Sequence, residues 1–195
     1  MNSSKKLILA SASPRRREIL SMAGYVFDVI SPDAEEYTGG DDPYTLTVEN
    51  SKLKAEAALK TGEGVFICAD TVVALEGMIL GKPKTKDKAY EMLRSLSGKT
   101  HSVVTGYTVT DGKTSVSGYV ETKVTMREIF RDEMEKYVES GEPLDKAGAY
   151  GVQGAAGVFV SQICGDYYTV VGLPLCKISE ILRKNFGIFP FSQIQ

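Results

Sequence analysis

The sequence predicts an α/β protein in which helices pack on a mixed, strongly twisted sheet. Apolar runs at 6–10 and 65–69 are typical of buried strands. Apolar residues at helical spacing occur within 43–60 and 85–97. The dipeptide Asp111-Gly112 joins two further strand-like runs, which indicates an antiparallel hairpin. Because strands and helices do not alternate strictly, a mixed sheet is expected rather than a purely parallel one.

The composition fits one domain, which is expected to span residues 1–195. The chain is 43% hydrophobic and 25% charged, so it can bury a sizeable core. Its formal net charge of −2 argues against general binding to nucleic acid or to anionic membranes. A local basic pocket for a phosphorylated small molecule is still compatible with that charge.

The ends of the chain and its cysteines indicate a cytoplasmic protein. Residues 1–10 lack the apolar stretch of a signal peptide, and no apolar run approaches the roughly 20 residues of a membrane span. The three cysteines form no CxxC pair. Cys68 and Cys176 lie in apolar sequence, which indicates buried free thiols in a reducing compartment.

The loop that follows the first strand has the features of an anion site. Ser13 suits an N-cap and Pro14 suits the first helical position, so a helix is expected from Pro14 to Gly24. Ser11 precedes this helix, and arginines occupy 15–17. Cations at a helix N-terminus oppose the helix dipole, so a bound anion explains these arginines better than a solvated first turn does.

A second strand is expected at 25–30, and a polar loop with five carboxylates follows at 31–42. Taken alone, the loop is explained by solubility, although carboxylate oxygens also suit Mg²⁺. The next helix, at 43–60, carries several lysines, each of which is more simply explained as solvated than as functional.

Two apolar runs, 65–69 and 72–75, flank Asp70. The first run is expected to be a strand buried on both faces, with Asp70 at its carboxyl end, where ligands bind in open α/β sheets. A turn at 76–77 then places Lys82 beyond a probable hairpin. For a lone Asp, capping of a turn would be the simpler explanation, but the other charged segments favour a functional role.

The rest of the chain is expected to add three helices, two hairpins and a glycine-rich segment. The expected bounds are 85–97, 131–140 and 173–186 for the helices, 101–110 with 113–125 and 158–163 with 167–171 for the hairpins, and 144–157 for the glycine-rich segment. Glycines let this last segment approach a ligand closely. The single histidine, His101, has no partner motif and is expected to be structural.

The common motifs of P-loop nucleotide-binding proteins, zinc proteases and serine hydrolases are absent. What remains is the anion-binding loop, carboxylates at Glu35, Glu36 and Asp70, scattered lysines and the glycine-rich segment. This set suits attack of water on a polyphosphate. A Mg²⁺ ion would neutralise phosphate charge and activate the water.

Six segments in order resemble the Maf family of nucleoside triphosphate pyrophosphatases. They are LILASASPRRREIL, SKLKAEAA, ADTVVALEGMILGKP, MLRSLSGKTHSVVTG, PLDKAGAYGVQGAAG and VVGLPL. The resemblance covers nearly the whole chain. It implies the Maf/inosine-triphosphatase-like α/β fold, with two lobes around a cleft. It also implies hydrolysis of a nucleoside triphosphate to the monophosphate and pyrophosphate with a divalent metal.

The resemblance implies roles for individual residues as well. Asp70 matches the catalytic residue of the family, and Asp70 and Glu36 are expected to hold Mg²⁺ or Mn²⁺, with Glu35 as the less favoured register for Glu36. Whether Asp70 acts as ligand, as general base or as both stays open. The residues expected to bind the substrate are Ser11, Arg15, Arg16, Lys54, Thr71, Lys82 and Gln153.

Arg16, Thr71 and Gln153 resemble the branch of the family that acts on dTTP and UTP. The Gln153 amide has a donor and an acceptor, which matches the N3–H and O4 edge shared by uracil and thymine. Two alternatives stay open: a different nucleotide, such as CTP, 7-methyl-GTP or a modified pyrimidine, or a regulator of septum formation that acts by binding a partner. Relatives commonly form homodimers, but no segment here locates an interface.

Overall fold

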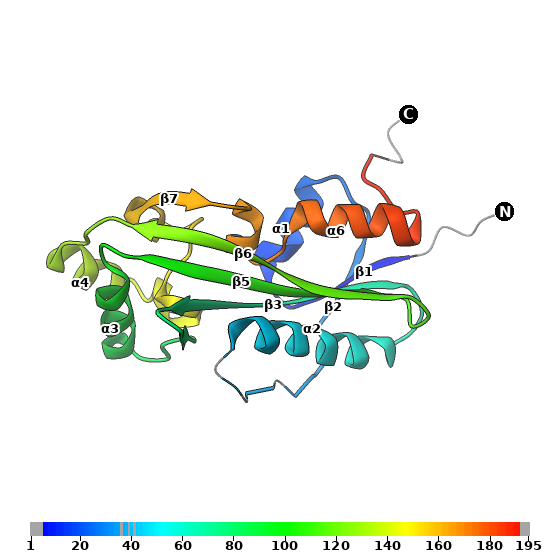
Figure 1. Ribbon diagram of the computed structural model, residues 1–195, viewed down its shortest axis with the longest axis horizontal. Coiled ribbons are helices and arrows are strands. Elements are labelled where there is room, and N and C mark those ends of the chain that lie inside the picture. The colour runs from blue at the N-terminus through cyan, green and yellow to red at the C-terminus, as the bar shows by residue number, and fades with distance from the viewer. Residues whose placement is uncertain (1–5, 36, 39, 41, 192–195) are drawn as a thin grey trace.

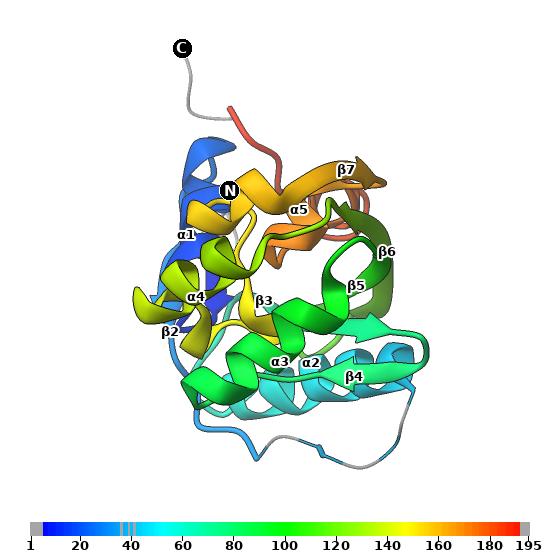
Figure 2. The same cartoon turned by 90° about the vertical axis from the view of Figure 1, so that its left-hand side faces the viewer.

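The structure is a computed structural model that describes residues 6–35, 37–38, 40 and 42–191. In this part of the chain, helices cover both faces of one seven-stranded sheet (Figures 1 and 2). The strands are β1 (Leu7–Ala10), β2 (Asp28–Ile30), β3 (Val65–Leu75), β4 (Met78–Leu80), β5 (Thr100–Thr110), β6 (Ser115–Met126) and β7 (Val160–Cys164). The α-helices are α1 (Pro14–Met22), α2 (Pro43–Leu59), α3 (Lys86–Leu96), α4 (Arg131–Glu139), α5 (Tyr167–Val171) and α6 (Leu175–Ile181).

The sheet is mixed, as predicted. Its order is β2-β1-β3-β5-β6-β7, with β4 also paired to β3. β1 runs parallel to β2 and to β3, whereas the other pairs are antiparallel. The hairpins predicted at Glu76-Gly77 and Asp111-Gly112 are both confirmed. Glu76 and Gly77 have φ values of 51° and 83°, as a two-residue type I′ turn requires.

β3 is the strand that pairs with β1 near its start and with β4 near its end, and it therefore connects these two parts of the sheet. One edge of β3 pairs with β5 from Phe66 to Ala74. The other edge pairs with β1 as far as Ile67 and with β4 from Val73 onward. Within the part of the chain that the structure describes, no strand pairs with this edge between Ile67 and Val73. We call this interval the β3 gap.

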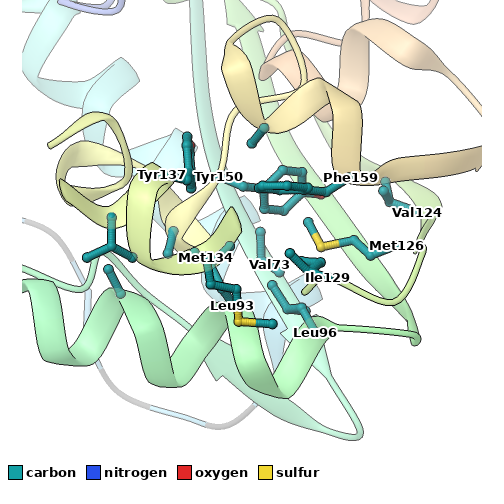
Figure 3. Close-up of a cluster of buried hydrophobic side chains, with 14 of the residues drawn as sticks. Val73, Leu93, Leu96, Val124, Met126, Ile129, Met134, Tyr137, Tyr150 and Phe159 are labelled. Carbon is teal, nitrogen blue, oxygen red and sulfur yellow. The ribbon is translucent and has the colours of Figure 1, made fainter. Parts of the chain in front are cut away.

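Three apolar clusters form the core. One lies at the β1 end, where α1, α5 and α6 pack against β1, β3 and β5. A smaller cluster joins α2 to the opposite face of the same strands. The third lies at the far end, where α3 and α4 pack against β3, β5 and β6 (Figure 3). Side chains of β3 alternate between the faces, so Val65, Ile67 and Ala69 join the first cluster while Phe66 and Cys68 join the second.

Two predictions of local structure were wrong. Residues 65–75 form one continuous strand, so Asp70 lies at the middle of β3 and not at its carboxyl end. Tyr167–Val171 forms helix α5 and not a strand. The Asp166 side chain accepts hydrogen bonds from the Tyr168 N–H and the Thr169 hydroxyl, at 2.9 Å and 3.0 Å. This N-cap overrides the strand preference of the apolar residues that follow.

The environment of the cysteines also differs from the prediction in part. Cys68 is buried, as expected, and burial raises the pKa of its thiol to about 12. Cys176 is exposed, as is Cys164. Apolar neighbours in the sequence of a helix do not bury a residue that lies on its outer side. None of the described helices is long and apolar enough to cross a membrane.

Gly106 sets how closely α2 approaches the sheet. It lies opposite Asp70 on β5, and a Cβ at this position would lie 2.3 Å from the backbone carbonyl carbon and oxygen of Thr47. Both atoms belong to the backbone of α2, so no side-chain rotation relieves the contact. Gly81 offers a contrast, because a Cβ there would have nothing within 4 Å.

We predict that Gly106→Ala destabilises the protein by about 3 kcal/mol, the upper part of the range for overpacking, because α2 must move away from the sheet. Gly81→Ala is the matched control and should change the free energy of unfolding by no more than about 0.5 kcal/mol. Urea denaturation of both variants measures the difference. Equal stabilities would show that α2 does not depend on the absent Cβ.

Candidate active site

The Asp70 carboxylate lies in the β3 gap and is held by α2. Lys54 Nζ lies 2.6 Å from Asp70 Oδ1, and these side chains are only 18% and 15% exposed. Asn50 Nδ2 donates to Asp70 Oδ2 at 3.3 Å. Asn50 and Lys54 lie four residues apart and therefore on one face of the helix. Asp70 and Lys54, each predicted separately as a site residue, are thus brought together by β3 and the helix that precedes it.

Asn50 is a site residue that the sequence analysis missed. Its side chain is 4% exposed and forms two hydrogen bonds with the backbone of Tyr37. The Tyr37 N–H donates to Asn50 Oδ1 at 2.6 Å, and Asn50 Nδ2 donates to the Tyr37 carbonyl at 3.2 Å. Asn50 therefore connects the acidic loop to Asp70. An available signal was its position one turn before Lys54 on the core side of α2.

The predicted metal ligands can be examined only in part. Glu36 lies outside the described residues, and Glu35 is exposed. No group of three His, Cys, Asp or Glu side chains in the described part of the chain could hold a metal ion. Asp70 fits as one oxygen ligand. Among the described residues, the only hydrogen bond to its Oδ2 is the 3.3 Å contact with Asn50, and carboxylate oxygens suit hard divalent cations.

Arg16 lies on the other face of β3 from Asp70 and is held by protein groups. Its Nε donates to the Gly172 carbonyl at 2.7 Å, and its Nη1 donates to the Ala69 carbonyl at 2.7 Å and to Ser11 Oγ at 3.2 Å. Its Nη2 donates to Thr71 Oγ1 at 3.1 Å. The guanidinium thus joins the loop after β1, the β3 gap and the end of α5. Three of the predicted substrate-binding residues, Ser11, Arg16 and Thr71, come together here.

The other three predicted substrate-binding residues outside α2, namely Arg15, Lys82 and Gln153, form none of the hydrogen bonds described above for the Arg16 group. Arg15 is partly buried, whereas Lys82 and Gln153 are exposed. The backbone places Lys82 beside the glycine-rich segment, because the Gly148 N–H donates to the Gly81 carbonyl at 3.1 Å. A Cβ on Gly148, whose φ is +68°, would lie 3.0 Å from the Val73 side chain. Glycine is therefore required where this segment crosses β3.

The glycine-rich segment is anchored to β5 by a buried pair. His101 Nε2 and the Tyr150 hydroxyl are 2.7 Å apart, and the two rings meet edge to face. His101 is 2% exposed, and its Nδ1 is buried with no hydrogen-bond partner among the described residues. Burial lowers the pKa of the His101 imidazole from 6.5 to about 4. The predicted structural role of His101 agrees with these contacts.

The lowered pKa of His101 predicts a loss of stability in acid. The unfolded chain takes up this proton near pH 6.5, whereas the folded chain does so only near pH 4. Above pH 6.5 the burial of neutral His101 does not lower the free energy of unfolding. As the pH drops from 6.5 toward 4, the free energy of unfolding falls by up to about 3 kcal/mol. Urea denaturation at pH 7.5 and 4.5 should show a smaller loss for His101→Gln than for the wild type. Equal losses would exclude this contribution.

A solved structure of another protein has a similar fold. A HAM1 protein from Coxiella burnetii superposes with a TM-score of 0.54 over 92% of this chain and 99% of that chain, at 17% identity. At this identity the likeness shows the fold alone. The sequence profile described as Maf-like protein matches residues 6–185. The chain therefore belongs to the Maf family.

Several curated relatives are similar over almost the whole chain. The dTTP/UTP pyrophosphatase of Alkaliphilus metalliredigens is 47% identical over 189 residues, which cover 94% of this chain and 98% of that protein. The dTTP/UTP pyrophosphatase of Thermococcus gammatolerans is 48% identical over 182 residues, covering 93% of this chain and 98% of that protein. The protein of the same name in Bacillus cereus is 44% identical over 182 residues, covering 92% and 95%.

Proposed function

We propose that this chain hydrolyses dTTP and UTP to the nucleoside monophosphate and pyrophosphate in the cytoplasm. The relatives at 44–48% identity that carry this activity in their names support the choice of substrate. The observation on which the proposal mainly rests is the carboxylate of Asp70, placed in the β3 gap and held by Lys54 and Asn50. A partly buried carboxylate with a nearby cation is suited to position and deprotonate water beside a phosphate chain.

In this proposal Asp70 accepts a proton from the attacking water. Lys54 orients the carboxylate, and its ammonium also lies close to the negative charge that develops on the phosphates. Arg15 approaches from the first turn of α1 and Lys82 from the loop after β4, and they bind phosphate oxygens. Arg16 and Thr71 lie on the opposite face of β3. The resemblance assigns Arg16, with Ser11, to the triphosphate, whereas Thr71 and Gln153 contact the base.

A divalent cation, Mg²⁺ or Mn²⁺, is part of the proposal. Asp70 would supply one oxygen ligand and Glu36 the other. When bound, the ion neutralises phosphate charge and lowers the pKa of a water molecule. The hydrogen bonds between Asn50 and the Tyr37 backbone support the placement, because they bring the acidic loop next to Asp70. Assembly into a homodimer stays a prediction.

The first test is turnover on a panel of nucleotides. With Mg²⁺ or Mn²⁺ present, the purified protein should release pyrophosphate from dTTP and UTP, with little from CTP, GTP or 7-methyl-GTP. Pyrophosphate and single phosphate are assayed separately. Release from another nucleotide would keep the reaction and change the substrate. If the folded protein released nothing from any of them, the partner-binding regulator would become the better hypothesis.

The second test is Asp70→Asn. Because the general base contributes about 10²–10⁴-fold, turnover of UTP should fall by at least about 10²-fold. The melting temperature should change little, because the amide oxygen still accepts from Lys54 or Asn50. Asp87→Asn on the exposed first turn of α3 is the matched control and should retain full activity. Near-normal activity of Asp70→Asn would remove Asp70 from the catalytic role.

A further inference from the structure

A series of hydrogen bonds connects the Thr71 hydroxyl, through the Thr105 hydroxyl, to the backbone carbonyl of Thr169. Thr71 on β3 and Thr105 on β5 are directly opposite each other in the sheet, and their Oγ1 atoms are 2.9 Å apart. The Thr105 hydroxyl also donates to the carbonyl of Thr169 in α5, at 2.8 Å. Thr105 and Thr169 are both 0% exposed, so water does not compete for these bonds. The proposed function gives Thr105 and Thr169 no role.

The direction of every bond in this series follows from counting protons. A hydroxyl has one proton, and a carbonyl oxygen can only accept. The Thr105 proton is therefore committed to Thr169. The 2.9 Å contact between Thr71 and Thr105 then requires the proton of Thr71, since two lone pairs would otherwise face each other. Arg16 has only donors and gives a third bond to Thr71 Oγ1 at 3.1 Å.

The hydroxyl of Thr71 is thus fixed as an acceptor toward any ligand. Its proton points to Thr105, and one of its two lone pairs takes the bond from Arg16. The second lone pair of the Thr71 oxygen is therefore the one that can accept a hydrogen bond from a ligand. Thr71 is partly buried in the β3 gap, on the face that Arg16 occupies. A ligand atom that meets this oxygen is favoured if it is a donor and disfavoured if it is an acceptor.

We infer that Thr105, acting through Thr71, is a positioning residue that selects nucleobases with an N–H at the ring nitrogen facing Thr71. Uracil and thymine have this group at N3, so Thr71 accepts the N3 proton and the Gln153 amide is left to donate to O4. Cytosine has an unprotonated nitrogen there, whose lone pair would face that of Thr71. Turning the Thr71 hydroxyl toward cytosine would break its bond to Thr105. The inference rests on the proposed function, because it takes Thr71 to contact the base.

The experiment compares kcat/KM for UTP and CTP in the wild type, Thr105→Val and Thr105→Ser. Valine removes the acceptor of the Thr71 proton, so the hydroxyl can turn and donate to cytosine. The preference for UTP over CTP should fall by about tenfold or more, the scale on which a site discriminates through one polar group. Serine keeps the hydroxyl and should keep the preference, which a purely structural role of Thr105 would not explain.

The melting temperature of each variant is measured alongside. If the larger valine prevents folding, Thr105→Ala removes the same hydroxyl with less volume and should shift the preference in the same direction. A folded valine or alanine variant with an unchanged preference would overturn the inference and leave the proposed function intact. A wild type that turned over neither UTP nor dTTP would overturn the proposed function, and the inference with it.

Discussion

The β3 gap is the feature on which the rest of the site depends. β3 is shared by both ends of the molecule, and it changes its neighbour from β1 to β4 along one edge. Asp70 and Thr71 lie where that change occurs. Because successive side chains of a strand point to opposite faces, the carboxylate meets α2 while the hydroxyl meets Arg16. The adjacent residues Asp70 and Thr71 therefore contact different groups on the two faces of β3, and both lie in the β3 gap.

Each face of β3 is completed by a different part of the chain. On one face, the close contact between Gly106 and α2 brings Asn50 and Lys54 to the carboxylate. On the other face, Arg16 fixes the loop after β1 against β3 and α5. The separation matches the proposal that the attacking water is activated on the α2 side and that Thr71 meets the base on the α1 side.

The sequence predicted most of the elements but not the geometry of the site. Periodicity and turn residues located the helices at 43–60 and 85–97 and the hairpin at 111–112, because these signals are local. The polar pair Asp70-Thr71 was taken as the end of a strand, since nothing local shows that β5 continues to pair with it. Asn50 was missed for the same reason. Asn50 belongs to the site because it forms hydrogen bonds with Tyr37 and Asp70, which are distant from it in the sequence.

The two carbonyl acceptors at Thr169 and Gly172 affect the order in which the site forms during synthesis of the chain. Arg16 donates to the Gly172 carbonyl, and Thr105 donates to the Thr169 carbonyl. Both donors belong to earlier parts of the chain, which leave the ribosome well before these carbonyls do. A nascent chain that ends before Thr169 can contain every strand of the sheet, yet the groups around Thr71 still lack their final partners. The proposed base-recognition side of the site is therefore completed only after Gly172 has been added to the chain.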